Sequence, residues 1–279
     1  MKLKKLIALF LVLMTLTGIA FLPALAEEAA VDPEGNVEFV YVDVTEEEEH
    51  PEFDEPVPDV EPYIPEELDR TIFGKDNRAR VINPSNYPYC CMAKIVVTAK
   101  CGHSWYGTGF MVGKNKMLTA AHCMYCYKCS SPAKTATFYF GYNAKNGKYY
   151  YKTSSSVTFY VGTKFTGRSY TVVNDYAVIK FKSNVGTKTG WLGIRWNYAA
   201  NKKTFNLAGY HGGILKKQKG KVYVLNNTHL KYTLDTQGGS SGGPVYDDDK
   251  YSVAINIAEN SSYNEAHRLT TAVKKLWSK

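Results

Sequence analysis

The sequence predicts an all-β protein built from two small antiparallel barrels with a short C-terminal helix. After residue 70 the chain is rich in Tyr, Val, Thr, Phe and Gly. Short runs of these residues, each bounded by Gly, Asn or Pro, recur at the spacing of antiparallel strands. Val273, Leu276 and Trp277 instead follow helical spacing. We expect strands at Lys94–Thr98, Ala136–Phe140, Ser156–Val161, Tyr176–Phe181, Thr204–Ala208, Val222–Leu225 and Ser252–Ile257, and a helix at Thr271–Trp277.

The chain begins with a segment that is typical of secretion. The basic start Met1–Lys5 precedes an almost wholly apolar run from Leu6 to Leu22. Small residues then stand where a signal peptidase reads, so we expect a signal peptide at residues 1–26, cleavage after Ala26 and an extracellular protein. A membrane anchor is the alternative, because the apolar run is about long enough to span a bilayer. The A-x-A ending and the charged residues that follow favour removal.

Residues 27–70 differ in composition from the rest of the chain. They contain 18 Asp and Glu residues, several prolines and a single basic residue, Arg70. Such a segment cannot supply a core and should be disordered or loosely extended. Residues 71–279 contain 30 Lys and Arg against 8 Asp and Glu, a net charge of +22. We expect an acidic propeptide that screens a basic mature domain until cleavage between Arg70 and Thr71, with a spacer that makes no contacts as the alternative.

The mature part divides into two predicted barrels. We expect residues 71–190 to form the N-terminal barrel and residues 191–279 to form the C-terminal barrel with the final helix. Its positive charge would attract nucleic acid or an anionic surface. No nucleic-acid recognition motif accompanies the charge, so no specific nucleic acid is expected. An anionic cell surface stays open as a binding partner. We expect the protein to be a monomer.

Three segments carry the residue types of nucleophilic catalysis. Thr236–Val245 places Ser241 among four glycines, which let the backbone turn sharply and direct its N–H groups at one point. Strand-like sequence on both sides argues against a flexible linker. His122 ends an apolar run, and Asp175 directly precedes an apolar strand. The order His122, Asp175, Ser241 is one of the known chain orders of the Ser-His-Asp triad, and the separations suit two barrels that meet at a cleft.

The motifs around these three residues are Thr119-Ala-Ala-His-Cys123, Asn174-Asp-Tyr-Ala-Val178 and Gly239-Ser-Ser-Gly-Gly-Pro244. They resemble the trypsin/chymotrypsin-like serine proteases, and more closely the bacterial glutamyl endopeptidase branch. The resemblance runs from about residue 71 to the C-terminus. It implies a chymotrypsin-like fold of two six-stranded Greek-key barrels. Further marks of the branch are Thr71–Val81, Asn86–Tyr89, Gly107–Gly113 and Asp235–Gly242.

Each member of the predicted triad has a role in peptide hydrolysis. His122 should take the Ser241 proton as general base and then protonate the leaving amine, while Asp175 orients the imidazole. Ser241 should attack the carbonyl and form an acyl-enzyme. The backbone N–H groups of Gly239 and Ser241 should bind the oxyanion. The substrates would be proteins or peptides, with no cofactor and no metal. The alternative from another class is an inert basic binding module on the same fold.

The sequence allows two alternatives for the residue preferred before the scissile bond: a basic residue or an acidic one. Asp235 lies at the base of the pocket in trypsin-like relatives, where a carboxylate favours Lys or Arg. Some glutamyl endopeptidases also have Asp there, however. In that branch Thr236 matches a residue that binds the substrate carboxylate, and the new α-amino group, here of Thr71, helps to form the pocket. Asn256 stands where the branch has its carboxylate-reading histidine. We expect a preference for Glu or Asp.

The cysteines all lie in the first predicted barrel. An even count in a secreted chain suggests disulfides, whose pairing stays open. Cys123, Cys126 and Cys129 could instead bind zinc in a reducing compartment, but the signal peptide argues for oxidation. In the resembled families the Cys that matches Cys123 often pairs with one near Gly107. Gly107 is not a cysteine, so that bridge must be replaced, and Cys101 is a candidate. The six are Cys90, Cys91, Cys101, Cys123, Cys126 and Cys129.

Overall fold

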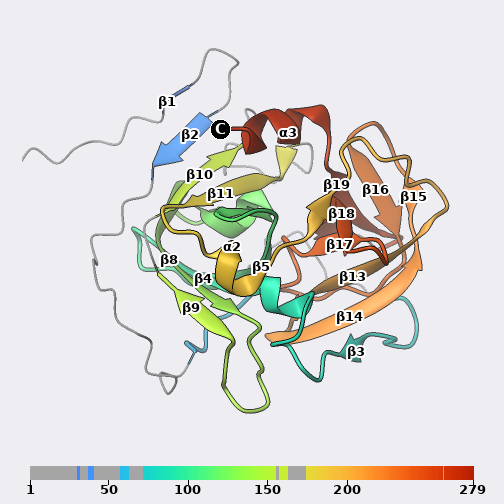
Figure 1. The fold of residues 1–279 in the computed structure, drawn as a ribbon, viewed down its shortest axis with the longest axis horizontal. Coiled ribbons are helices and arrows are strands. Elements are labelled where there is room, and N and C mark those ends of the chain that lie inside the picture. Colours follow the sequence, from blue (N-terminus) through green and yellow to red (C-terminus); the bar gives the residue numbers. More distant parts are fainter. Residues whose placement is uncertain are drawn as a thin grey trace, which may run out of the picture.

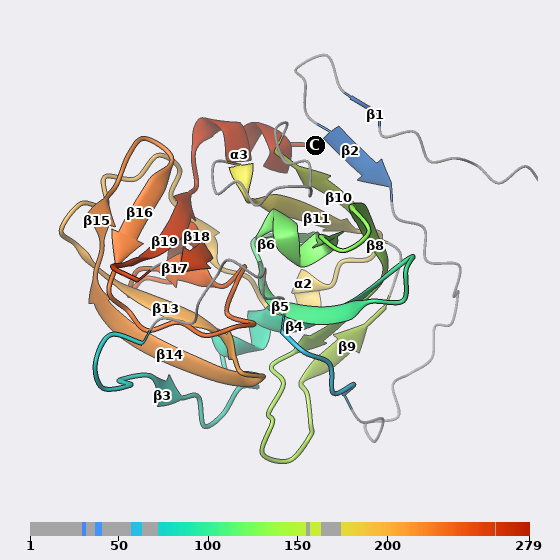
Figure 2. The ribbon, with the colours of Figure 1, turned by 180° about the vertical axis from the view of Figure 1, so that it is seen from behind.

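Two curled β-sheets lie side by side in the computed structural model, and a short C-terminal helix lies against them (Figure 1). Figure 2 shows the same arrangement from behind. The predicted all-β class with a short C-terminal helix is therefore confirmed. The structure describes residues 30–31, 37–40, 57–62, 72–154, 157–162, 174–259 and 261–279.

The first sheet has the order β1-β2-β10-β11-β6-β5-β4-β8-β7, with β9 paired to β8. All of its pairs are antiparallel. Large aromatic side chains fill its interior, including Trp105, Phe110 and Phe138, which are fully buried. The six main strands are β4 (Met92–Ala99), β5 (Ser104–Met111), β6 (Lys116–Thr119), β8 (Ser131–Phe140), β10 (Val157–Val161) and β11 (Ala177–Phe181). The short ones are β1 (Ala30–Val31), β2 (Val37–Val40), β7 (Tyr125–Cys126) and β9 (Tyr151–Thr153).

The second sheet has the order β15-β16-β19-β18-β17-β13-β14-β3, with β12 paired in parallel to β18. A separate apolar cluster lies inside it and includes the fully buried Phe205, Leu207 and Tyr232. Its main strands are β13 (Thr204–His211), β14 (Ile214–Lys221), β16 (His229–Tyr232), β17 (Pro244–Tyr246), β18 (Tyr251–Glu259) and β19 (Asn264–Arg268). The short ones are β3 (Ala79–Arg80), β12 (Gly193–Ile194) and β15 (Tyr223–Val224).

The C-terminal helix α3 (Thr271–Trp277) has the bounds that the sequence predicts. Val273 and Leu276 are buried, as the helical spacing requires. Although α3 follows the second sheet, it packs on β11 of the first, and Lys116 Nζ donates to the carbonyl of Trp277. No helix in the described ranges is long and apolar enough to cross a membrane. The remaining helical turns are η1 (Tyr89–Cys91), η2 (Ala121–Met124) and α2 (Gly186–Thr189).

The N-terminal third of the chain contributes strands to both sheets. Strand β2, within the predicted propeptide, pairs with β10 in the register Val161 to Val37, which differs from the disordered or loosely extended state expected there. The physical reason is that a strand edge can bind an added strand through backbone groups alone, without a core from the added segment. Strand β3 joins β14 of the second sheet, although it lies in the range 71–190 assigned to the first barrel. The predicted signal peptide and the Arg70–Thr71 bond lie outside the described residues.

Candidate active site

His122 and Asp175 meet because two neighbouring strands stop at the same edge of the first sheet. Thr119, the last residue of β6, is opposite Ala177, the first residue of β11. His122 follows in the helical turn η2, and Asp175 lies just before β11. One carboxylate oxygen of Asp175 accepts from the backbone N–H of His122 at 3.0 Å, and the other lies 2.6 Å from Nδ1 of the ring. The carboxylate therefore holds both the backbone and the ring of His122.

The electrostatics of this pair favour a more basic imidazole. His122 is 1% exposed and Asp175 is fully buried. Burial alone acts to lower the pKa of His122, but the negative charge and hydrogen bond of Asp175 outweigh it and hold that pKa above its usual value of 6.5. A histidine with these properties can accept a proton from a neighbouring hydroxyl.

Ser241 lies in the loop between β16 and β17, whose conformation only glycine permits at two positions. Gly239 has φ +91° and Gly242 has φ +85°. A Cβ at Gly239 would collide with the ring of Tyr106, and a Cβ at Gly242 would collide with the carbonyl oxygen of Thr108. The glycines that the sequence places around Ser241 are therefore needed for left-handed backbone and for close approach to β5.

Thr108 on β5 fastens this loop to the first sheet. Its backbone N–H donates to the carbonyl of Ser241 at 2.8 Å, and its hydroxyl donates to the carbonyl of Gly239 at 2.7 Å. Cys123, the residue after His122, also directs its Sγ at the Ser241 carbonyl, at 3.4 Å. The serine loop of the second sheet is thus bound to the part of the first sheet that carries His122. No sequence pattern indicated this role of Thr108, although the residue lies inside the Gly107–Gly113 motif.

The backbone of the serine loop leaves two N–H groups available at the expected place. Ser240 N donates to Gln237 O at 3.0 Å, and Gly242 N donates to Asn256 O at 2.7 Å. Within the described part of the chain, the N–H groups of Gly239 and Ser241 donate to no other backbone group. These are the two donors predicted for an oxyanion.

Asp235 lies near the loop, but its carboxylate already accepts three hydrogen bonds. The side chain is 1% exposed. One oxygen accepts from Phe73 N at 2.8 Å, and the other accepts from Asn77 N at 3.0 Å and from Gln218 Nε2 at 3.3 Å. Asp235 thus anchors the segment at residues 73–77. Gln218 was missed by the sequence analysis, because it lies on β14 with no motif around it.

Thr236 and Asn256 are both buried beside the loop, but only one of them has its polar side-chain atoms paired. Asn256 accepts from Tyr232 Oη at 2.6 Å and donates to Ser240 Oγ at 3.2 Å. Oγ1 of Thr236 has no hydrogen-bond partner within the described ranges. A buried hydroxyl without a partner is uncommon and invites a polar ligand. Thr71, the fourth residue predicted for the pocket, lies outside the described residues.

Comparison with known sequences gives a consistent match. The family model described as trypsin-like peptidase domain matches residues 107–255. A glutamyl endopeptidase of Bacillus licheniformis is 29% identical over 220 residues, which cover 73% of this chain and 67% of the relative. An extracellular metalloprotease of Bacillus subtilis is 30% identical with the same coverage, and a glutamyl endopeptidase of Staphylococcus aureus is 25% identical over 70% of this chain and 54% of its own length.

Comparison with solved structures also finds proteases. A Glu endopeptidase in complex with MPD superposes with a TM-score of 0.62 at 26% identity and covers 75% of this chain and 98% of that chain. The protease Anisep from Arthrobacter nicotinovorans superposes with a TM-score of 0.56 at 21% identity, covering 67% and 94%. The second similarity concerns the fold alone.

Proposed function

This chain belongs to the trypsin-like peptidase family and is a serine endopeptidase, and on that premise we propose that it is secreted and cleaves after glutamate or aspartate. The observation that carries the catalytic part of the proposal is the junction of the two sheets. There Asp175 holds His122, and Thr108 holds the Ser241 loop against the same sheet. The extracellular location rests on the predicted signal peptide, and a relative named as extracellular supports it.

The proposed reaction assigns one role to each group at this junction. Neutral His122 takes the proton of Ser241 as the hydroxyl attacks the carbonyl carbon, and Asp175 stabilises the imidazolium that forms. The N–H groups of Gly239 and Ser241 receive the negative charge that develops on the carbonyl oxygen. His122 then gives its proton to the leaving amine. Water repeats the sequence on the acyl-enzyme and restores the serine.

The engagement of Asp235 supports an acidic rather than a basic preference. A carboxylate that already accepts from Phe73 N, Asn77 N and Gln218 Nε2 has little capacity left for a substrate ammonium or guanidinium group. The donors left for a substrate carboxylate are instead the buried hydroxyl of Thr236 and the second N–H of the Asn256 amide, whose first N–H donates to Ser240 Oγ. Because Asp235 anchors Phe73, an α-amino group made by cleavage before Thr71 would start two residues from that anchor and could add a positive charge.

We expect cleavage of a mixed peptide library after Glu, less after Asp, and not after Lys or Arg. The Thr236→Val variant should lose about 10- to 100-fold in kcat/KM on Glu substrates, since a hydrogen bond to a charged group contributes about 1.5–3 kcal/mol. Its melting temperature should change little, because the hydroxyl has no partner to lose. Thr270→Val is the matched control: it removes another buried hydroxyl that has no partner, at the start of α3. Cleavage after Lys or Arg would contradict the acidic preference.

The acidic segment has contacts that support a role as a bound propeptide. Tyr106 N donates to Glu61 O at 3.1 Å, and Pro62 forms a parallel bridge with Tyr106. Val57 and Val60 pack against the first core cluster. The ring of Tyr106 borders Gly239 of the serine loop. We infer that residues 57–62 bind beside the proposed oxyanion site and keep the precursor inactive until processing at Arg70–Thr71.

A peptide of residues 27–70 should therefore inhibit the mature enzyme, residues 71–279, when added in trans. Binding should weaken as salt increases, because opposite net charges contribute to it. A scrambled peptide of the same composition is the control, and it should bind at least about tenfold more weakly if the hydrophobic and backbone contacts matter. Equal inhibition by both peptides would mean that the segment binds through its negative charge alone and that its specific contacts are unimportant. Neither binding nor inhibition would contradict it.

The inert binding module is separated from the enzyme by one labelling experiment. A fluorophosphonate reacts with a serine only when a base and an oxyanion site activate its hydroxyl. We expect the mature chain to be labelled on Ser241, as mass spectrometry of its peptides would establish. An unlabelled but folded chain would favour the binding module.

A further inference from the structure

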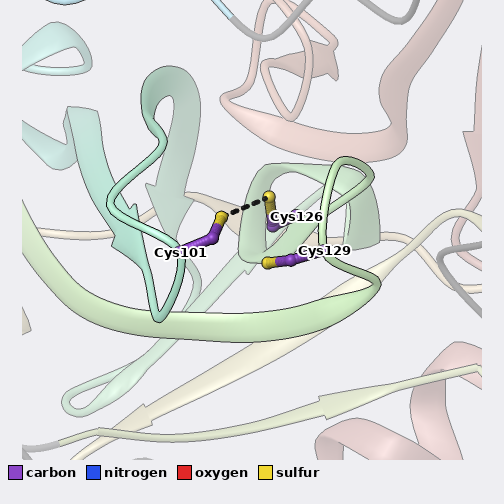
Figure 3. Close-up of side chains that lie close together, drawn as sticks. All are labelled: Cys101, Cys126 and Cys129. Carbon is purple, nitrogen blue, oxygen red and sulfur yellow. Dashed lines mark hydrogen bonds between the residues drawn. The ribbon is translucent and has the colours of Figure 1, made fainter.

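Three cysteine side chains from two separate hairpin tips of the first sheet converge on one point. Cys101 lies in the tight turn between β4 and β5, where Gly102 has φ +82°. Cys126 is the last residue of β7, and Cys129 lies in the turn between β7 and β8. Figure 3 shows the three sulfur atoms pointing toward one another. The pattern of the sequence alone suggested Cys123 as the partner of the other two, but Cys123 points at the Ser241 carbonyl instead.

Two of the distances in this cluster match those between adjacent ligands of a tetrahedral zinc site. The three sulfur atoms all lie within 4.8 Å of one another, and those of Cys101 and Cys126 are 3.8 Å apart. Nδ1 of His103 lies 3.5 Å from the Cys126 sulfur. With Zn–S of about 2.3 Å and Zn–N of about 2.0 Å, adjacent ligands of a tetrahedron stand about 3.8 Å apart for two sulfurs and about 3.5 Å apart for sulfur and nitrogen.

The surroundings orient the ligands as a metal site requires. The His103 ring stacks on Trp105 at 5.2 Å and meets the Tyr127 ring edge-on at 5.6 Å. The Cys129 sulfur lies 3.0 Å from the hydroxyl of Ser131. Contacts of this kind fix the direction of ligand atoms in metal sites. Cys101 is exposed, which leaves a path from solvent for an ion.

We propose that Cys101, Cys126, Cys129 and His103 form a structural site for one divalent zinc ion. On binding, the three thiols lose their protons to solvent and coordinate as thiolates, while neutral His103 coordinates through Nδ1. No electron is transferred and no other reactant is needed. The three sulfur atoms form the cluster, and His103, whose Nδ1 lies beside the Cys126 sulfur, would supply the fourth ligand, as in structural rather than catalytic zinc sites.

The position of the site suggests that the ion stabilises the loop next to His122. The loop from Cys123 to Cys129 directly follows His122, and zinc would tie it to the β4–β5 hairpin. Gly107 leaves Cys123 without a bridging partner, and a Cβ at that position would collide with the Cys123 sulfur. The ion would thus supply a crosslink near His122 in place of the bridge to Cys123 that Gly107 excludes. A disulfide between two of the three cysteines is the competing chemistry, and it would leave one thiol over.

The test is the metal content of the full chain, measured on the Ser241→Ala variant to avoid self-cleavage. The protein is purified without chelator, its zinc is measured by mass spectrometry, and its thiols and disulfides are mapped on the same sample. We expect one zinc per chain with all three thiols reduced. Cys101→Ser should lose the zinc, whereas Cys90→Ser, whose thiol donates to Thr189 O outside the cluster, should keep it. His103→Gln should bind more than about tenfold more weakly.

Cobalt spectroscopy and proton release are two further measurements of the same site. If Cys101→Ser does not fold, the parent chain is loaded with Co²⁺, whose charge-transfer bands must indicate three thiolates in a tetrahedral site. Zinc uptake by the reduced chain should also release up to three protons. A metal-free chain with a disulfide within the cluster, a reduced chain that takes up neither ion, or zinc retained in Cys101→Ser would each overturn the proposal. None of these results depends on peptidase activity, so they leave the proposed function separately testable.

Discussion

Ser241→Ala is expected to lower kcat by about a million-fold while the fold stays intact. The estimate follows other triads, in which removing the nucleophile leaves only the rate enhancement from binding and the oxyanion site. Structural change should be small, because the Ser241 contacts that fasten the loop to Thr108 and Cys123 use its backbone carbonyl. Single-turnover hydrolysis of a Glu-containing peptide and a thermal melt would measure the two effects.

Ser240→Ala is the matched control for that experiment. Its hydroxyl lies in the same loop and accepts from Asn256 Nδ2 at 3.2 Å, but it takes no part in the proposed chemistry. Fluorophosphonate labelling should persist in Ser240→Ala and vanish in Ser241→Ala. Labelling that survives in Ser241→Ala, or activity within tenfold of the parent, would show that another residue is the nucleophile.

Asp175→Asn is expected to lower kcat by about ten-thousand-fold, because it forces His122 into the wrong tautomer. The backbone N–H of His122 needs an acceptor, so the amide oxygen of the new side chain would occupy the place of Oδ1. The amide NH₂ would then face Nδ1 of the ring, which must accept rather than donate. The ring proton moves to Nε2, the atom that should take the proton from Ser241. Rates of Asp249→Asn, which changes a largely exposed carboxylate, should stay near those of the parent.

The pH dependence of kcat/KM is a second measurement of the interaction between His122 and Asp175. His122 works as a base only when neutral, so kcat/KM should fall as pH decreases through its pKa. Because Asp175 raises that pKa, the acid limb of the parent should lie above pH 6.5. In Asp175→Asn the anion is gone and burial dominates, so the limb should move to lower pH. An unchanged limb in the variant would mean that another group controls it.

Local patterns in the sequence predicted the elements that carry the chemistry. Runs of β-branched and aromatic residues indicated β4, β8, β10 and β11 of the first sheet and β13, β15 and β18 of the second, but not β5, β6, β14, β16, β17 or β19. The spacing of Val273 and Leu276 indicated the terminal helix. The glycines of the serine loop could be predicted because their need is local: φ is positive at Gly239 and Gly242. The roles of His122, Asp175 and Ser241 followed from their motifs and chain order, and they stay predictions until the variants are measured.

Contacts between segments that lie far apart in the chain could not be predicted from local sequence patterns. Asp235 stands where a trypsin-like pocket would have its carboxylate, and only the arrival of Phe73 and Asn77, about 160 residues away in the chain, decides that it is occupied. Strand β2 likewise joins β10 through backbone groups, which no side-chain pattern announces.

The sequence by itself determined the fold class, the nucleophile loop and the candidate triad, because each depends on the conformational preferences or chemistry of neighbouring residues. The tertiary structure alone decided which polar groups remain available. It engaged Asp235 and left Thr236 Oγ1 without a partner in the described ranges. It also brought Cys101 rather than Cys123 to Cys126 and Cys129. The physical reason is that hydrogen bonds and metal ligands act over about 3–4 Å in space, and only the packing of the sheets sets those distances.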